Sequence, residues 1–255
     1  ILPQIGATAK HFNYMGLKDI NYYRVPTPFT ELMYKTGFEQ GHVVDAFFTV
    51  NTSNQFNLSI AFKGMRSLGN YQHILSSTKN FRFTTSYVSK NNLYSLRTHI
   101  VMQDIFNQEN GGLSDDDLVE FESGNPEFTD RSLFDPLFED AQSNLKGKRF
   151  HFDQTYLIKK RDSLDSNQIS IGNLLTFEDK YYHFTQDSKN LLFSDAFVSS
   201  NLSDKSTLES FFTEFNARYS NKNLGALKAS IGYYNYNYGY NSLVILNNET
   251  ITNRL

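Results

Sequence analysis

The chain has 255 residues, a net charge of −3 and no cysteine, which excludes a disulfide framework and a thiolate metal site or nucleophile. The near balance of charge gives no sign of a nucleic-acid-binding surface, and no apolar run approaches the roughly 18 residues of a membrane helix. Phenylalanine and tyrosine number 23 and 16, whereas there are only five prolines. This composition is typical of a protein built from many extended strands.

Alternation of apolar and polar residues recurs along the chain, and such alternation places successive side chains on opposite faces of a β-strand. The segment "QFNLSIAFKG" (55–64) is the clearest example, because every second residue from Phe56 to Phe62 is apolar and the residues between are polar or small. In chain order the pattern predicts ten strands, at residues 30–36, 43–50, 56–63, 81–88, 94–102, 150–158, 169–177, 211–219, 227–231 and 242–246.

The connections between these strands alternate in length. Short turns at one rim and long loops at the other are typical of an up-and-down barrel in a membrane. We therefore predict an all-β fold, an antiparallel up-and-down transmembrane β-barrel, as a single domain over residues 1–255. Turns facing the periplasm are predicted at residues 52–55, 89–92, 160–168 and 220–223. Large extracellular loops are predicted at about 66–80, 103–148 and 185–208.

The two faces of the predicted strands differ in chemistry. In a membrane barrel the apolar face meets lipid and the polar face lines the lumen, whereas in a soluble β-sandwich the apolar face packs inward. The barrel interpretation predicts that an arginine at Leu58 costs roughly 2–4 kcal/mol and that the same change at Ser59 is mild. The predicted lipid-facing residues are Phe56, Leu58, Ile60, Phe62, Phe81, Phe83, Leu96, Ile100, Ile171 and Phe215. The predicted lumen-lining residues are Asp45, Lys63, Arg82, Arg97, His99, Asp153, Glu178, Glu214, Arg218 and Lys228.

Aromatic residues gather near both ends of the predicted strands, with aliphatic residues between. Two such belts are typical of membrane barrels, where they lie at the two interfaces. The predicted turn-side belt contains Phe56, Tyr87, Tyr94 and Tyr219. The predicted loop-side belt contains Phe150, Tyr181, Tyr182, Phe184 and the run "YYNYNYGY" (233–240).

The longest predicted loop segment, residues 107–150, carries ten acidic residues between Asp115 and Asp140. Ser114 followed by three aspartates predicts a helix N-terminus, because serine caps helices and carboxylates are favourable at the positive end of the helix dipole. A Ca²⁺ or Mg²⁺ site is the alternative, since hard cations bind clustered carboxylates, although the EF-hand spacing is absent. We favour the capped, solvated helix and predict no metal.

The sequence contains no recognised catalytic motif. Neither HExxH nor GxSxG occurs, and the six histidines form no tight cluster with acidic residues. His99 and His151 share the polar strand face, where we expect them to form hydrogen bonds rather than to bind metal. We therefore predict that the protein is not an enzyme and uses no cofactor.

Several long stretches resemble the putative porin family of Bacteroidota, outer-membrane barrels. They are "PTPFTELMYKTGFEQGHVVDAFFTVNTSNQFNLSIAFKGMRSLGNYQHILSSTKNFRFTTSY", "QENGGL", "FESGNPEF" and "LKGKRFHFDQTY", and the similarity is densest from about Pro26 to Tyr182. The resemblance implies a pore in the outer membrane of a Gram-negative bacterium. Members are typically much longer than 255 residues, so it also implies that this chain is part of a longer barrel whose leader has been removed.

Three functions remain open at this stage. The first is a porin-like channel for passive passage of small polar solutes. The second is a non-conducting barrel subunit of a larger outer-membrane assembly for protein export or barrel insertion. The third is a secreted β-sandwich that binds glycan. The expected partners are outer-membrane lipid, lipopolysaccharide and other outer-membrane proteins, with no nucleic acid.

Overall fold

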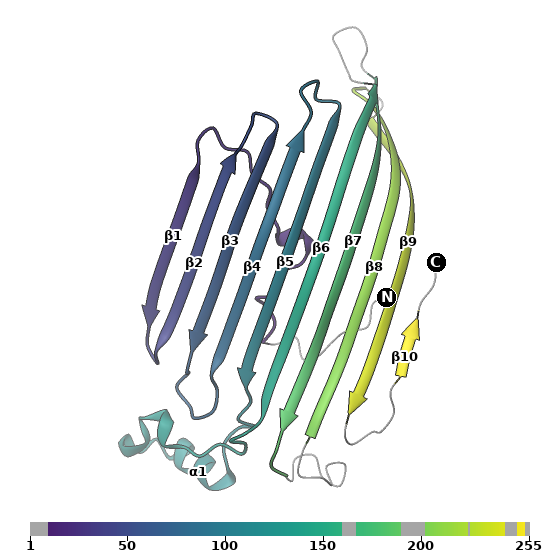
Figure 1. Cartoon of the computed structure of the whole chain (residues 1–255). Helices are drawn as coiled ribbons and strands as arrows, with labels where there is room; N and C mark the ends of the chain where they lie inside the picture. Colours follow the sequence, from purple (N-terminus) through teal and green to yellow (C-terminus); the bar gives the residue numbers. More distant parts are fainter. Residues whose placement is uncertain (1–9, 160–166, 190–201, 224, 243–248, 253–255) are drawn as a thin grey trace.

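The computed structural model describes residues 10–159, 167–189, 202–223, 225–242 and 249–252. Ten strands form one sheet in which each strand pairs with the next one along the chain, and every pairing is antiparallel (Figure 1). The strands are β1 (Phe29–Gly37), β2 (Gly41–Asn51), β3 (Phe56–Ser67), β4 (Ser76–Val88), β5 (Tyr94–Gln108), β6 (Gln142–Lys159), β7 (Asn167–Gln186), β8 (Leu202–Asn221), β9 (Gly225–Ser242) and β10 (Glu249–Thr252).

This architecture confirms the predicted all-β, antiparallel, up-and-down fold. Nine of the ten predicted strands lie within β1 to β9. Of the predicted strand at 242–246, Ser242 ends β9 and the rest lies outside the described residues, whereas β10 follows at Glu249–Thr252. Within the described residues the sheet is open, with β1 and β10 at its two edges.

The strands are longer than predicted, and the predicted loops at 66–80, 103–148 and 185–208 are correspondingly too long. Their flanks are strand: β5 continues to Gln108 and β6 begins at Gln142. In these flanks apolar and polar residues still alternate, but they have exchanged faces. The charged Asp104 points to the face that is apolar elsewhere, and the apolar Ile105 points to the other face, where it is fully buried. A rule that expects one face to stay apolar therefore ends the strands too early.

Short and long connections lie mostly at opposite ends of the sheet. Residues 52–55 and 89–93 are short turns at one end, called the turn end here, and residues 68–75 and 109–141 are longer connections at the other, the loop end. The hairpin at 38–40 departs from the predicted alternation of short and long connections, because it is short and lies at the loop end.

The connection at 109–141 contains the predicted helix. Helix α1 (Asp115–Ser123) is capped by Ser114, whose side chain accepts a hydrogen bond from the backbone N–H of Asp117. The short 3₁₀ helices η2 (Pro126–Phe128) and η3 (Arg131–Leu133) follow, and α1 lies beyond the loop end of the sheet (Figure 1). The described residues contain no group of three side chains that could hold a metal ion. None of the described helices is long and apolar enough to cross a membrane.

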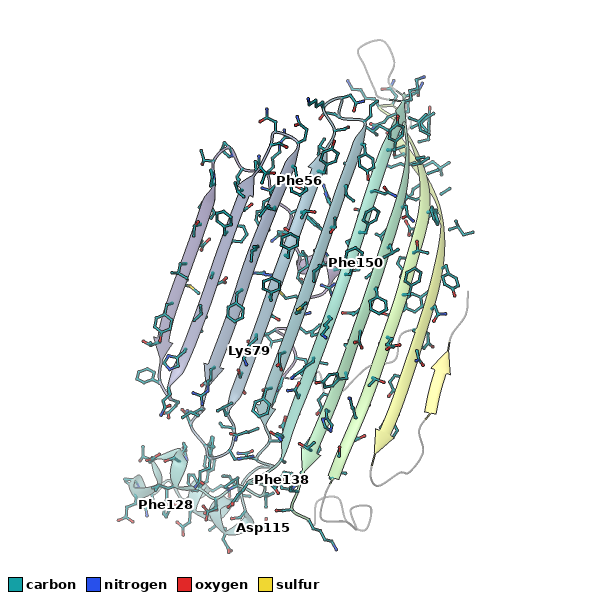
Figure 2. All side chains as sticks on the ribbon, in the orientation of Figure 1. Phe56, Lys79, Asp115, Phe128, Phe138 and Phe150 are labelled. Atoms are coloured by element: carbon teal, nitrogen blue, oxygen red, sulfur yellow. The ribbon has the colours of Figure 1, made fainter. Side chains whose placement is uncertain are left out.

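A small aromatic cluster holds this connection together. Phe134 is 1% exposed and its ring packs against those of Phe121 and Phe128 at centroid distances of 5.9 and 5.8 Å. The guanidinium of Arg131 lies 4.4 Å from the centroid of the Phe121 ring. Figure 2 labels Phe128, Phe138 and Asp115 in this part of the molecule. The connection is thus a folded unit rather than an irregular loop.

Residues 10–28 precede the sheet and lie across one of its faces (Figure 1). They contain one turn of 3₁₀ helix, η1 (Leu17–Asp19), and otherwise no regular secondary structure. The part that contacts the sheet, residues 10–25, is called the inner segment below. Its docking onto the sheet was not predicted from the sequence.

Candidate functional site

The strand register places all ten predicted lumen-lining residues on one face of the sheet. Asp45 lies opposite Lys63, and Arg97 lies opposite Asp153. Arg218 likewise lies opposite Lys228, and the remaining members follow from the two-residue period of each strand. This face, which the inner segment covers in part, is called the inner face.

The opposite, outer face carries all ten predicted lipid-facing residues. Ile60 lies opposite Phe83, which in turn lies opposite Ile100. No other described element covers the outer face, where Ile60 is 42% and Phe215 is 59% exposed. In a soluble β-sandwich these side chains would be buried between two sheets, so the single sheet does not support the sandwich alternative.

Only some of the residues predicted for the two aromatic belts lie on the outer face. Tyr87 and Tyr94 lie on the outer face near the turn end, with ring centroids 6.1 Å apart. Near the loop end the prediction was wrong for several members, because the register turns them to the inner face. Those inner-face residues are Tyr182, Phe184, Tyr234, Tyr236, Tyr238 and Tyr240.

Polar side chains of the inner face hold the backbone of the inner segment. The amide of Gln103 both accepts from the backbone N–H of Met15 (2.7 Å) and donates to its carbonyl (3.1 Å). Asn80 donates to the carbonyl of Asn13 at 3.3 Å, so two neighbouring strands supply the partners that an aperiodic backbone lacks.

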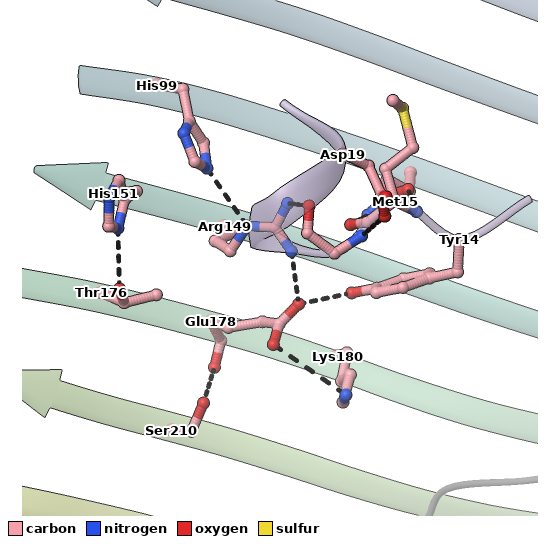
Figure 3. Close-up of polar contacts among 12 residues, drawn as sticks. Tyr14, Met15, Asp19, His99, Arg149, His151, Thr176, Glu178, Lys180 and Ser210 are labelled. Atoms are coloured by element: carbon pink, nitrogen blue, oxygen red, sulfur yellow. Dashed lines mark hydrogen bonds and ion pairs between the residues drawn. The ribbon is translucent and has the colours of Figure 1, made fainter. Parts of the chain in front are cut away.

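Arg149 is the centre of this network (Figure 3). Its side chain is 3% exposed and its Nη1 lies 3.4 Å from Oε1 of Glu178. Its Nη2 donates to the carbonyl of Gly16 at 3.0 Å, and its Nε donates to Nε2 of His99 at 3.2 Å. One guanidinium therefore joins β5, β6, β7 and the inner segment, as its five fixed donors allow.

Glu178 accepts hydrogen bonds from Arg149 and Tyr14 and forms a longer ion pair with Lys180. Tyr14 Oη donates to Oε1 of Glu178 at 2.8 Å, and Lys180 Nζ lies 3.9 Å from its Oε2. The Tyr14 ring lies over Gly147, and a Cβ at that position would overlap the ring. The glycine thus allows the inner segment to approach the sheet closely.

His99 has both ring nitrogens engaged and is 1% exposed. Because Nε2 accepts the Arg149 bond, Nδ1 carries the proton and donates to Tyr22 Oη, 2.7 Å away. The ring stacks on that of His151 at a centroid distance of 4.9 Å, and His151 Nδ1 lies 2.8 Å from Thr176 Oγ1. Both histidines form hydrogen bonds, as predicted.

The inner segment runs from the loop end to the turn end of the sheet. At the loop end Lys10 pairs with Glu109 at 2.6 Å. Towards the turn end, Ser86 Oγ donates to the carbonyl of Tyr23 at 3.0 Å, and Arg24 donates to the carbonyl of Asn54 at 3.2 Å. The segment is therefore fixed along its length.

Comparison with known families agrees with this geometry. A profile of the family described as "putative porin" matches residues 1–255. The chain belongs to this family. Searches of curated proteins and of solved structures found no match. The family description points to the outer membrane and supports the general prediction of a porin-like protein.

In this porin-family chain, some of the predicted lumen-lining residues form ion pairs with one another on the inner face. Lys228 Nζ and Glu214 Oε1 are 2.6 Å apart, and Lys63 Nζ and Asp45 Oδ2 are 3.9 Å apart.

Of the other predicted residues, Glu178 has its ion pairs within the Arg149 network, and the remaining five have none in the described part of the chain. Arg82 Nη1 lies 3.7 Å from the Met15 sulfur, and the Arg97 guanidinium lies 5.8 Å from the Tyr22 ring centroid. Neither these two arginines nor Arg218 has a described carboxylate within the 4.0 Å of an ion pair.

The residues of the site that were missed from the sequence include Arg149, Tyr14 and Tyr22. Arg149 has the same parity as His151, so extending the predicted strand at 150–158 by one residue would have found it. The two tyrosines lie in a segment without alternation, and no local signal indicates where they dock.

Proposed function

We propose that the chain forms part of the wall of an outer-membrane channel, through which small polar solutes pass passively. The observation that carries this proposal is the sorting of the sheet into an inner face with charged residues from β2 to β9 and an exposed apolar outer face. In a membrane the apolar face meets lipid, so solutes would pass over the polar face. Closure of the sheet into a barrel is part of this proposal, as is contact of the outer face with outer-membrane lipid and lipopolysaccharide.

The inner segment restricts where solutes would pass. The Arg149 side chain beneath it is 3% exposed, whereas the Lys228 side chain on β9 is 52% exposed. The solute path would therefore run beside the segment, over β8 and β9, where Arg218 and Lys228 lie opposite each other. Lys228 is paired with Glu214 at 2.6 Å, so Arg218 supplies the excess positive charge at this position, and it favours anions in the path.

The test is single-channel conductance of the purified full-length protein. Arg218→Glu should shift the reversal potential towards cation selectivity. The double variant Arg82→Glu with Arg97→Glu should shift it less, because these arginines lie on β4 and β5 against the inner segment, away from β8 and β9. Lys148→Glu is the matched control, because Lys148 lies on the outer face opposite Asp179 and should leave selectivity unchanged. Conductance with unchanged selectivity in all variants would remove these arginines from the path.

A specific observation also favours the second candidate function, a non-conducting barrel subunit of a larger outer-membrane assembly for export or barrel insertion. The inner segment buries polar side chains of the inner face, including Asn80, Gln103 and Arg149. A face filled in this way needs no water path. Absence of any conductance from the correctly folded full-length protein would favour this function over the channel.

A further inference from the structure

Strand β9 carries four tyrosines at alternate positions on the inner face: Tyr234, Tyr236, Tyr238 and Tyr240. Tyr234 lies opposite Phe212 and Tyr238 lies opposite Leu208, and the same rows continue to Thr176 and Lys180 on β7. The tyrosines therefore share the face of the Arg149 network. These four residues are called the tyrosine ladder below.

The ladder is not an interfacial belt, because the register places it on the inner face. The outer face behind it changes along the strand. Asn235 lies opposite Phe211, and that outer-face row continues to the exposed Phe177. Asn237, two residues closer to the loop end, lies opposite Glu209. The ladder thus begins behind the apolar part of the outer face and extends past it towards the loop end.

The ladder presents aromatic planes, and the hydroxyl of Tyr234 is itself buried. The ring centroid of Tyr234 is 6.0 Å from that of Phe212 and 5.7 Å from that of Tyr236. Leu208, opposite Tyr238, is 1% exposed, so the base of the ladder is packed. The ladder rings themselves are only half-buried.

Hydroxyl groups occupy two of the β8 positions opposite the ladder, since Ser210 lies opposite Tyr236 and Ser206 lies opposite Tyr240. Charges lie at the two ends of the ladder. Asp204 is on the same face of β8 and forms a hydrogen bond with Tyr240, and the cations of β8 and β9 lie at their turn-end half. The ladder is therefore suited to a ligand without net charge that has both apolar and hydroxyl-bearing surfaces.

We propose that the tyrosine ladder binds the rings of a neutral oligosaccharide, so that carbohydrate is the solute class; this rests on the proposed channel function. The C–H faces of a sugar ring pack on phenol planes, and its hydroxyls form hydrogen bonds with tyrosine and serine hydroxyls. Alternate residues of a strand are about 6.6 Å apart, so the ladder offers successive stacking positions along the direction of passage.

Calorimetric titration of the full-length protein in detergent with maltohexaose and with cellohexaose tests this inference without requiring conductance. At least one sugar should bind, and Tyr236→Ala and Tyr238→Ala should each weaken binding by about two- to tenfold, the range expected for one aromatic stacking contact. Tyr238→Phe keeps the ring and should retain most of the affinity. Tyr233→Ala is the matched control, because Tyr233 lies in the same run but on the outer face, beside Phe211.

The outcomes separate this inference from the proposed function. Failure of both sugars to bind, or equal affinities of the Tyr233→Ala and Tyr238→Ala variants with circular dichroism showing both folded, would overturn the ladder as a sugar site even if the protein conducts. Sugar binding that depends on Tyr236 and Tyr238 in a protein without conductance would support the ladder and overturn the channel. Reversible current block by the same sugar would support both.

Discussion

At the scale of single residues, Arg149 decides how the inner segment is held. It is buried, and its partners are a carboxylate, a histidine and a backbone carbonyl from three different parts of the chain. Removing one partner of a buried ion pair leaves the other charge with too few compensating contacts. Glu178 would keep only Tyr14 and the more distant Lys180.

Arg149→Met should therefore lower the free energy of unfolding by roughly 3 kcal/mol, the lower part of the range for breaking a buried pair. Urea titration of the full-length protein folded into lipid vesicles measures this change. Lys63→Met is the control: its ion pair with Asp45 spans 3.9 Å and its side chain is half exposed, so the change should stay below about 1 kcal/mol. Equal losses in the two variants would show that the network around Arg149 adds no stability.

Sequence reasoning at this scale placed residues on faces but did not find their contacts. The alternation of side chains along each strand is enough to place His99 and Glu178 on the polar face. It could not show that Arg149 lies between them, because the three residues meet only through the register of β5, β6 and β7. Parity also made Ser59 a tolerant position, whereas Ser59 is 2% exposed and bonded to Thr84 at 2.5 Å. An arginine at Ser59 would therefore be destabilising as well.

At the scale of elements, the alternation of β9 changes its chemistry along one strand. Towards the turn end Ile231 is apolar and on the outer face, whereas towards the loop end Asn237 occupies that face. The sequence shows the alternation but not the point at which a strand leaves the apolar band. For that reason the alternation alone predicts an aromatic belt at 233–240, whereas the register turns its even-numbered tyrosines to the inner face.

A better-matched test of the two faces than Leu58 and Ser59 uses neighbouring residues of β9. Ile231, on the outer face, is 75% exposed, and Ser230, on the inner face, is also exposed. Ile231→Arg should lower folding stability in lipid vesicles by roughly 2–4 kcal/mol if it lies near the bilayer midplane. Ser230→Arg should have little effect, because its side chain would stay in water. A larger loss at Ser230 than at Ile231 would reverse the assignment of the faces.

At the scale of the whole molecule, the meander of strands was predictable and the inner segment was not. Each hairpin is local, so alternation and turn composition are enough to indicate it. The bond between Tyr14 and Glu178, in contrast, joins residues 164 positions apart. The partners of the segment come from strands that must first pair with one another, so no local pattern in residues 10–25 can indicate where it docks.

The two ends of the sheet should face opposite sides of the membrane, with the loop end outside the cell. The chain has no cysteine, so a single introduced cysteine reports one position. Asp116→Cys in the exposed first turn of α1 should react with an impermeant thiol reagent on intact cells. Lys90→Cys in the exposed turn at 89–93 should react only after the outer membrane is opened, and it spares Asn91, which accepts turn hydrogen bonds from Ser89 and Leu93. Labelling of Lys90→Cys but not Asp116→Cys on intact cells would invert the topology and place the tyrosine ladder at the periplasmic side.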